Sequence, residues 1–175
     1  DPQETFALTL IAERIPSKFN SDDGYLPRLK GVVSLQLRNF LAAEKWLKVA
    51  LEKATEKHDV RLLQMVSKSL SEYYLATNKP WLALDYASAS LNYNNQLQHL
   101  NDQASLHYLL SNIYQQLGDE ISSLKYLRAY ADFQYSTSDN TTVSLLTTMD
   151  KRIEAIKQKQ KRAEQENSLL ANKVT

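Results

Sequence analysis

The stretch LSNIYQQLGDEISSLKYL, residues 110–127, decides the fold. Its apolar residues recur at three- and four-residue spacing on both sides of Gly118 and Asp119, which is the pattern of two amphipathic helices. The glycine suits a left-handed exit from the first helix, and the aspartate suits a cap on the second. We therefore predict a helical hairpin that turns at Gly118.

The same pattern returns every 40 residues. Small residues occupy one register and are followed three positions later by aromatic residues: Ala43, Ala83 and Ser123, then Trp46, Tyr86 and Tyr126. Three further registers hold small, aromatic and apolar residues: Gly31, Ser71 and Ser111; Tyr74 and Tyr114; Leu51, Leu91 and Ala131. We predict two helices per unit, with the small residues where the helices cross and the aromatics between neighbouring units.

The breaks between helices fall where such hairpins need them. The segment Asn78-Lys79-Pro80 ends one helix and places Pro80 in the first turn of the next, where its missing N–H costs little. Candidate caps open the first helix of successive units: Ser21 or Asp22, then Asp59, then Asn101 or Asp102.

Composition supports an all-α fold. The 175 residues include only three glycines and four prolines, whereas sheet proteins need turn residues every 8–12 positions. The absence of cysteine excludes disulfide frameworks and thiolate metal sites, and 21 basic against 20 acidic residues give no overall attraction to nucleic acid. No apolar run approaches the roughly 18 residues of a membrane span, and we interpret the chain as a segment of a longer protein.

These features resemble the tetratricopeptide repeat (TPR) family over residues 25–135. The resemblance rests on the small residue and tyrosine of the first helix, Gly118-Asp119 at the turn, and the alanine and aromatic of the second. The departures are the 40-residue spacing in place of 34, Ser34 in place of tyrosine, and Asn78 in place of glycine. The resemblance implies a TPR-like α-solenoid with a helical half repeat (1–20), three repeats (21–59, 60–100 and 101–140) and a C-terminal capping or coiled-coil helix (141–175).

The C-terminal helix differs from the repeats because no glycine or proline interrupts residues 143–173. We expect Leu145, Met149, Ile153 and Ile156 to cap the last hairpin. A four-three spacing defines a heptad seam: Met149, Ile153, Ile156, Gln160, Ala163, Asn167, Leu170 and Val174. Asparagine at such a position favours a parallel two-stranded register, so the helix is either the seam of a homodimer or a solvated helix.

Nothing in the sequence predicts catalysis. The three histidines, His58, His99 and His107, lack the spacing that would place two on one helical face, so we expect no catalytic residue, no cofactor and no metal. The excess of basic residues in 151–175 has no interleaved aromatic, and we interpret it as a solvated helix face that does not bind nucleic acid.

A stack of helical hairpins offers a concave surface lined by its first helices. Projecting the family's groove positions onto this chain gives a candidate site for a protein or an extended peptide: Arg28, Val32 and Gln36; Lys68, Glu72 and Leu75; Tyr108, Asn112 and Gln115. The alternative is that the N-terminal helix, residues 3–14, fills this groove.

The order of elements resembles the periplasmic TPR sensor regions of Gram-negative membrane signalling proteins, whose output is a GGDEF diguanylate cyclase or a histidine kinase. That resemblance implies an input domain that passes a conformational signal through the C-terminal helix. Two alternatives remain: a soluble TPR adaptor or chaperone scaffold, and a cytoplasmic peptide-responsive regulator.

Overall fold

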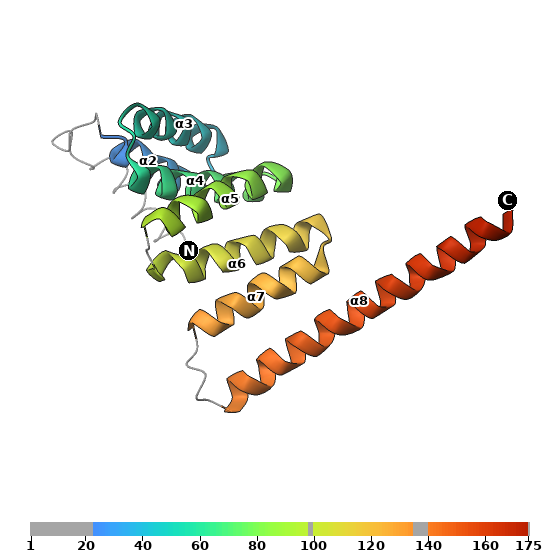
Figure 1. Ribbon diagram of the computed structural model, residues 1–175. Coiled ribbons are helices and arrows are strands. Elements are labelled where there is room, and N and C mark those ends of the chain that lie inside the picture. The colour runs from blue at the N-terminus through green and yellow to red at the C-terminus, as the bar shows by residue number, and fades with distance from the viewer. Residues whose placement is uncertain (1–22, 98–99, 135–139, 175) are drawn as a thin grey trace.

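The computed structural model describes residues 23–97, 100–134 and 140–174. In these residues the chain is helical and contains no strand, which confirms the all-α prediction. The helices are α2 (Tyr25–Gln36), α3 (Phe40–Glu56), α4 (Val60–Ala76), α5 (Pro80–Leu97), α6 (Leu100–Leu117), α7 (Glu120–Gln134) and α8 (Asn140–Val174) (Figure 1). The predicted N-terminal helix, residues 3–14, and the candidate caps Ser21 and Asp22 lie outside the described residues.

Each described helix packs against the next, most extensively in the pairs α2–α3, α4–α5 and α6–α7. The first helices of the pairs also contact one another, α2 with α4 and α4 with α6. Between the described parts of α3, α5 and α7 there are no such contacts. The pairs therefore curve toward the side formed by α2, α4 and α6.

Small side chains let the helices of each pair approach closely. Ala43 and Ala83 are completely buried, and a Cβ built on Gly31 would lie 2.6 Å from Cγ of Leu47. In the second and third pairs serine takes the place of Gly31 and adds a polar contact. The Ser71 hydroxyl donates to the carbonyl of Ala83 (2.7 Å), and the hydroxyls of Ser111 and Ser123 lie 3.3 Å apart. The small residues thus lie at helix crossings, as the sequence predicts.

The turns that join the two helices of each pair share the same backbone conformation. Arg38, Asn78 and Gly118, spaced by 40 residues, all have positive φ, at 56°, 57° and 78°. The backbone N–H of each of these residues donates to the carbonyl of the residue three positions earlier. The N–H of the next residue donates to the carbonyl of the residue five positions before it, as in a Schellman motif. Gly118 and Asn78 were expected at such turns. Arg38 was not, because arginine rarely adopts this conformation.

Two of the predicted caps are present. The Asp59 carboxylate accepts from the N–H of Leu62 (2.9 Å) at the start of α4, and Asp119 accepts from the N–H of Ser122 (3.0 Å) at the start of α7. Helix α6 begins at Leu100, so the candidate caps Asn101 and Asp102 lie inside its first turn and the predicted cap is wrong. Pro80 begins α5, as expected. A further cap, not among the predicted ones, is Asn39, whose Oδ1 accepts from the N–H of Ala42 at the start of α3 (3.1 Å).

The aromatic registers meet inside a pair and not between units, which corrects the prediction. The rings of Tyr74 and Tyr86 stack with centroids 5.4 Å apart, and those of Tyr114 and Tyr126 stack at 5.5 Å. The correction follows from the turn geometry, which places residues twelve apart on facing sides of the two helices. Because position 34 is serine, Trp46 has no stacked ring among the described residues, and the Lys30 ammonium lies over the indole ring instead (4.7 Å).

Helix α8 runs without interruption from Asn140 to Val174 and, among the described helices, contacts only α7. Its far half extends away from the other helices (Figure 1), and every side chain described in 157–169 is exposed. Ile153 is buried, and Met149 and Ile156 are partly buried. Leu145 is exposed and Leu146 is buried in its place, whereas Met149, Ile153 and Ile156 keep the face that the sequence predicts.

Candidate functional site

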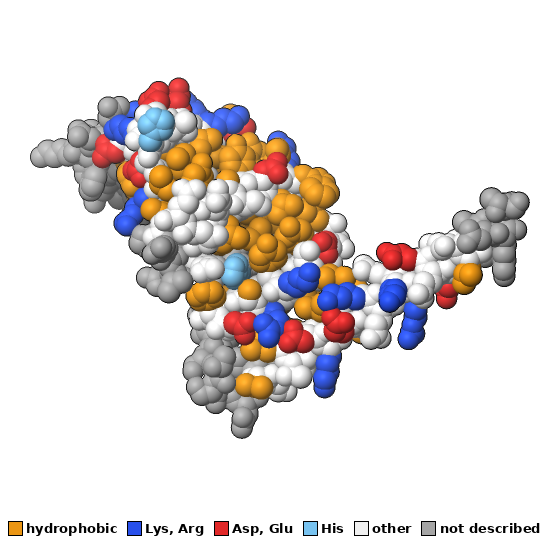
Figure 2. Space-filling view, in the orientation of Figure 1, with side chains coloured by type: hydrophobic (Ala, Val, Ile, Leu, Met, Phe, Trp, Pro, Cys, Tyr) orange, Lys and Arg blue, Asp and Glu red, His pale blue; other side chains and the backbone are white. Residues whose placement is uncertain are grey.

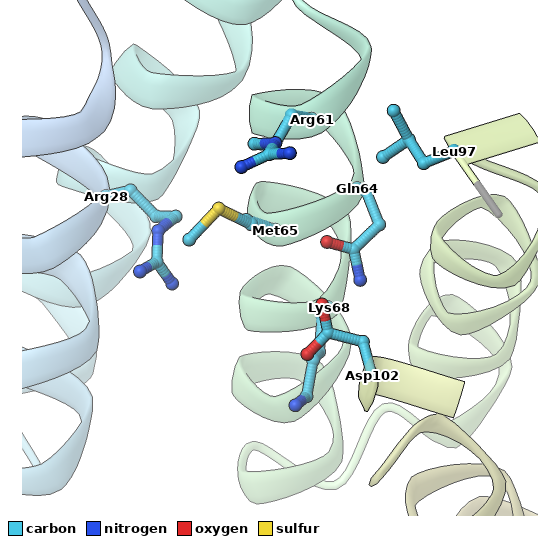
Figure 3. A pocket seen from close by; sticks show the side chains of 7 residues that line it. All are labelled: Arg28, Arg61, Gln64, Met65, Lys68, Leu97 and Asp102. Atoms are coloured by element: carbon cyan, nitrogen blue, oxygen red, sulfur yellow. The ribbon is translucent and has the colours of Figure 1, made fainter. Parts of the chain in front are cut away.

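Three adjoining hollows run from the side formed by α2, α4 and α6 to the space between α6, α7 and α8. The first, of about 200 Å³, is lined by Arg28, Arg61, Gln64, Met65, Lys68, Leu97 and Asp102 (Figure 3). The second, of about 500 Å³, is lined by Lys68, Glu72, Ala104, Ser105, Tyr108, Leu109, Asn112 and Tyr130. The third, of about 520 Å³, is lined by Tyr108, Ser111, Asn112, Gln115, Gly118, Glu120, Ser123, Leu124, Leu127 and Arg152.

Shared lining residues join the three hollows into one surface, which we call the concave groove. Lys68 lines the first and second hollows, and Tyr108 and Asn112 line the second and third. Six of the nine predicted groove residues line it: Arg28, Lys68, Glu72, Tyr108, Asn112 and Gln115. The structure brings these six together from three helices that are far apart in sequence.

The other three predicted groove residues do not line these hollows. Gln36 is exposed near the end of α2, where the turn at Arg38 carries the chain away. Leu75 is partly buried and packs against the hydrophobic core, and Val32 is also partly buried. Two of the three, Val32 and Gln36, belong to α2, which contributes only Arg28 to these hollows.

Charged side chains inside the groove are only partly neutralised. Arg28 Nη1 donates to Ser69 Oγ (3.2 Å) and Lys68 Nζ donates to Ser105 Oγ (2.8 Å), so both cations bond to neutral hydroxyls. Burial lowers the pKa of Arg28, an effect partly offset by the negative charge of Glu72. Burial also raises the pKa of Glu72, and Lys68 and Arg28 reduce that rise.

Sequence reasoning missed several groove residues. Arg61, Gln64 and Met65 precede the projected positions on α4, and Tyr130 and Arg152 come from α7 and α8, which were not assigned to the groove. Gln64 could have been found, because a glutamine among the apolar residues of 62–66 is a polar group on a buried stretch. Arg152 bonds to Glu120 through both Nε and Nη2, which brings α8 to the edge of the third hollow.

The predicted dimer seam divides into two parts. Ile153 is 6% exposed, and with Met149 and Ile156 it belongs to the part of α8 that packs on α7. Gln160, Ala163 and Asn167 are exposed, whereas the side chains of Leu170 and Val174 lie outside the described residues. The part of the seam free to meet a second copy therefore begins after Ile156.

Hydrophobic side chains also gather on the surface over α3 and α5, whereas α8 carries mainly polar and charged groups (Figure 2). Leu41 and Trp81, 40 residues apart, are 83% and 70% exposed. Both lie in the first turn of the second helix of a pair, away from the residues that line the groove.

Of the histidines, His58 has positive φ in the turn before α4, and His107 contacts the rings of Tyr126 and Phe133 on α7. His99 lies outside the described residues. The described part of the chain holds no cluster of His, Asp or Glu side chains suited to a metal ion. It also holds no helix that combines the length and apolar character needed to cross a membrane.

Comparison of the chain with protein-family models, with curated proteins and with solved structures gives no match. Proposals about its function therefore depend on the chemistry of the concave groove and on the form of α8.

Proposed function

We propose that the chain is a TPR-like α-solenoid that binds a protein or an extended peptide in its concave groove. The support for the solenoid is the 40-residue recurrence of contacts: a close crossing, a left-handed turn and a ring stack. The close crossing and the left-handed turn recur in all three pairs and the ring stack recurs in the second and third, as in the members of a stacked array.

One observation carries the binding proposal: the three hollows adjoin through Lys68, Tyr108 and Asn112. An extended peptide advances about 3.3 Å per residue and presents its backbone N–H and C=O groups to its surroundings. Asn112 and Gln115 offer amide groups that can bond to such a backbone, and Tyr108, which is 49% exposed, offers an aromatic surface. Polar side chains among apolar ones are typical of peptide grooves.

We further propose that the module is the periplasmic input domain of an inner-membrane signalling protein, with a diguanylate cyclase or a histidine kinase as output. The support is α8, whose near half packs on α7 and whose far half is exposed. Arg152 belongs to α8 and also lines the third hollow, so a bound peptide would contact the output helix directly. Parallel pairing of the exposed part of the seam in a homodimer would give that helix a partner.

A displayed library of ten-residue peptides, selected on the full chain, tests the binding proposal. Asn112→Ala should weaken selected peptides about 5- to 30-fold, because a lost hydrogen bond costs about 1–2 kcal/mol. Gln116→Ala is the matched control, because Gln116 is exposed on the same helix and does not line the three hollows. Failure to enrich any peptide, or equal loss in both variants, would contradict the proposal.

The gene around this segment tests the signalling proposal. A reading frame that continues into a span of about 20 apolar residues and an output domain supports an input domain. A frame that stops near Thr175 would instead favour the soluble adaptor, which uses the same groove without a membrane connection.

A further inference from the structure

The first hollow contains buried polar groups that have no hydrogen-bond partner in the described part of the chain. Gln64 is only 2% exposed, yet its Nε2 is buried without a hydrogen-bond partner. Nε of Arg28, which lines the same hollow from α2, is also buried and unpartnered. A buried donor left unbonded costs about 1–3 kcal/mol, so two at one place require an explanation.

Both unpartnered atoms are donors. They belong to an amide NH₂ and a guanidinium, and the ammonium of Lys68 lines the same hollow with one hydrogen bond made to Ser105. A group that satisfies such a set must accept hydrogen bonds and carry negative charge. Guanidinium groups bond to carboxylates and phosphates in this way, often through two parallel hydrogen bonds.

The charge of the lining favours one negative charge over two. The lining holds three basic residues, Arg28, Arg61 and Lys68, and one acidic residue, Asp102; Asp102 and Glu72 of the adjoining hollow both act on Arg28. A phosphate dianion would experience repulsion from both carboxylates. A carboxylate carries less charge, and its planar pair of oxygens matches the fork of a guanidinium.

The rest of the hollow is apolar and small. Met65 extends from α4 toward Arg28, and Leu97 lines the side formed by the end of α5 (Figure 3). A volume of about 200 Å³ suits a short side chain and not a polypeptide segment. We propose that this hollow binds the carboxylate of a small organic acid with a short apolar tail, held by Arg28 and Gln64 and packed against Met65 and Leu97.

This inference does not require a peptide in the groove. The carboxylate can belong to a free small acid or to the end of a longer chain that enters from the adjoining hollow. The two sources present the same group to Arg28 and Gln64, so the experiment must include a probe for each.

The test is a titration of the full chain, observed through the side-chain N–H resonances of Arg28 and Gln64. With 4-methylpentanoate we expect saturable shifts of both resonances at millimolar concentration. 4-Methylpentanamide, which has the same shape without the charge, should give none. Acetate should bind at least about 5-fold more weakly, which corresponds to about 1 kcal/mol of lost apolar contact. Acetyl-Gly-Gly-Leu is the probe for a chain end. If this peptide binds more tightly than 4-methylpentanoate, the natural carboxylate belongs to a chain end; if it binds more weakly, the natural carboxylate belongs to a free acid.

Variants separate a ligand site from a structural one. Gln64→Glu keeps the size of the side chain but replaces the donor with an acceptor, and it should abolish binding. The matched control, Gln36→Glu, makes the same change at an exposed position and should leave binding unchanged. Arg28→Met should also abolish binding. It should leave the stability of the ligand-free chain unchanged or higher, because it removes a buried, incompletely bonded cation.

Three results would overturn the inference: no shift with 50 mM 4-methylpentanoate, binding of inorganic phosphate in preference to the carboxylate, or retained binding in folded Arg28→Met. Loss of stability in Arg28→Met without added ligand would assign Arg28 a structural role instead. None of these results bears on peptide binding at Asn112, so the two proposals fail independently.

Discussion

The hydroxyl of Ser71 donates a hydrogen bond to the backbone carbonyl of Ala83, 2.7 Å away, where α4 crosses α5. Both residues are completely buried. A side chain larger than serine or alanine at either position would separate the two helices. Small residues at such crossings therefore hold each pair at its observed spacing.

Replacing Ala83 with leucine tests this crossing. We expect the free energy of unfolding to fall by roughly 1–3 kcal/mol, because the added atoms overpack a completely buried position. Denaturant unfolding measures the change. Ala155→Leu is the control, since Ala155 is exposed on α8, and it should change stability little. Equal stability of the two variants would show that Ala83 does not lie at a close crossing.

Gly31 tests the crossing of the first pair. In Gly31→Ala the new Cβ would lie 2.6 Å from Leu47 Cγ and 3.2 Å from the Leu47 backbone nitrogen. Overpacking of about 1–3 kcal/mol should exceed the gain of about 0.5–1 kcal/mol that alanine brings to a helix. A double-mutant cycle with Leu47→Ala should show coupling between the sites. Additive effects would exclude the Leu47 contact as the cause.

Arg38 offers a stabilising change. Its φ of 56° is unfavourable for any residue with a Cβ, by about 1–2 kcal/mol. Arg38→Gly should raise the free energy of unfolding by roughly 0.5–1 kcal/mol, after subtraction of the entropy that glycine adds to the unfolded chain. Arg38→Ala removes the same charge but keeps the Cβ. A gain in that variant as large as in Arg38→Gly would mean that the backbone conformation is not the cause.

The burial of Glu72 should make the stability of the fold depend on pH. Burial raises its pKa in the folded state above the usual 4.5, so the folded chain holds this proton at a pH where the unfolded chain has lost it. The contribution of Glu72 to the free energy of unfolding is therefore largest below pH 4.5, and it is lost as the pH rises through the raised pKa of the folded state. Glutamine carries no charge at any pH, so Glu72→Gln should not lose stability as the pH rises, and it should be more stable than the wild type at pH 7.

Thermal unfolding between pH 4 and 8 measures the difference. Glu52→Gln makes the same change at an exposed position on α3 and is the control. A Glu72→Gln variant that is less stable than the wild type at pH 7 would show that the attraction of Lys68 and Arg28 outweighs the cost of burial.

The exposed part of the seam predicts self-association. Truncation after Ile156 removes the exposed positions Gln160, Ala163 and Asn167 and should leave only monomer in sedimentation velocity. Asn167→Leu should strengthen association, because a polar residue at this position lowers the stability of a coiled coil. The same mass for the full and the truncated chain would exclude this part of α8 as the dimer contact.

The sequence predicted features that depend on one residue and its spacing. The turns at Asn78 and Gly118, the caps at Asp59 and Asp119, and the uninterrupted C-terminal helix each follow from local chemistry. The left-handed turn at Arg38 could not be read from composition, because the fold imposes it on a residue that disfavours it.

Features that depend on helix rotation were less predictable. Leu145 and Leu146 differ by one position, and only the packing of α8 on α7 decides which is buried. The projection from the family's repeat finds six residues of the groove, whereas Tyr130 of α7 and Arg152 of α8 are recognised as lining it only once the helices are assembled.

The single contact of α8 with the described helices makes it a lever with its fulcrum at α7. Residues 157–174 extend about 27 Å beyond this fulcrum, at about 1.5 Å per residue. A tilt of α7 by about 5° would displace the tip of the lever by about 2 Å, which is comparable to helix shifts that carry signals in other proteins. Small changes of angle within the stack are thereby converted into larger displacements at the far end of α8.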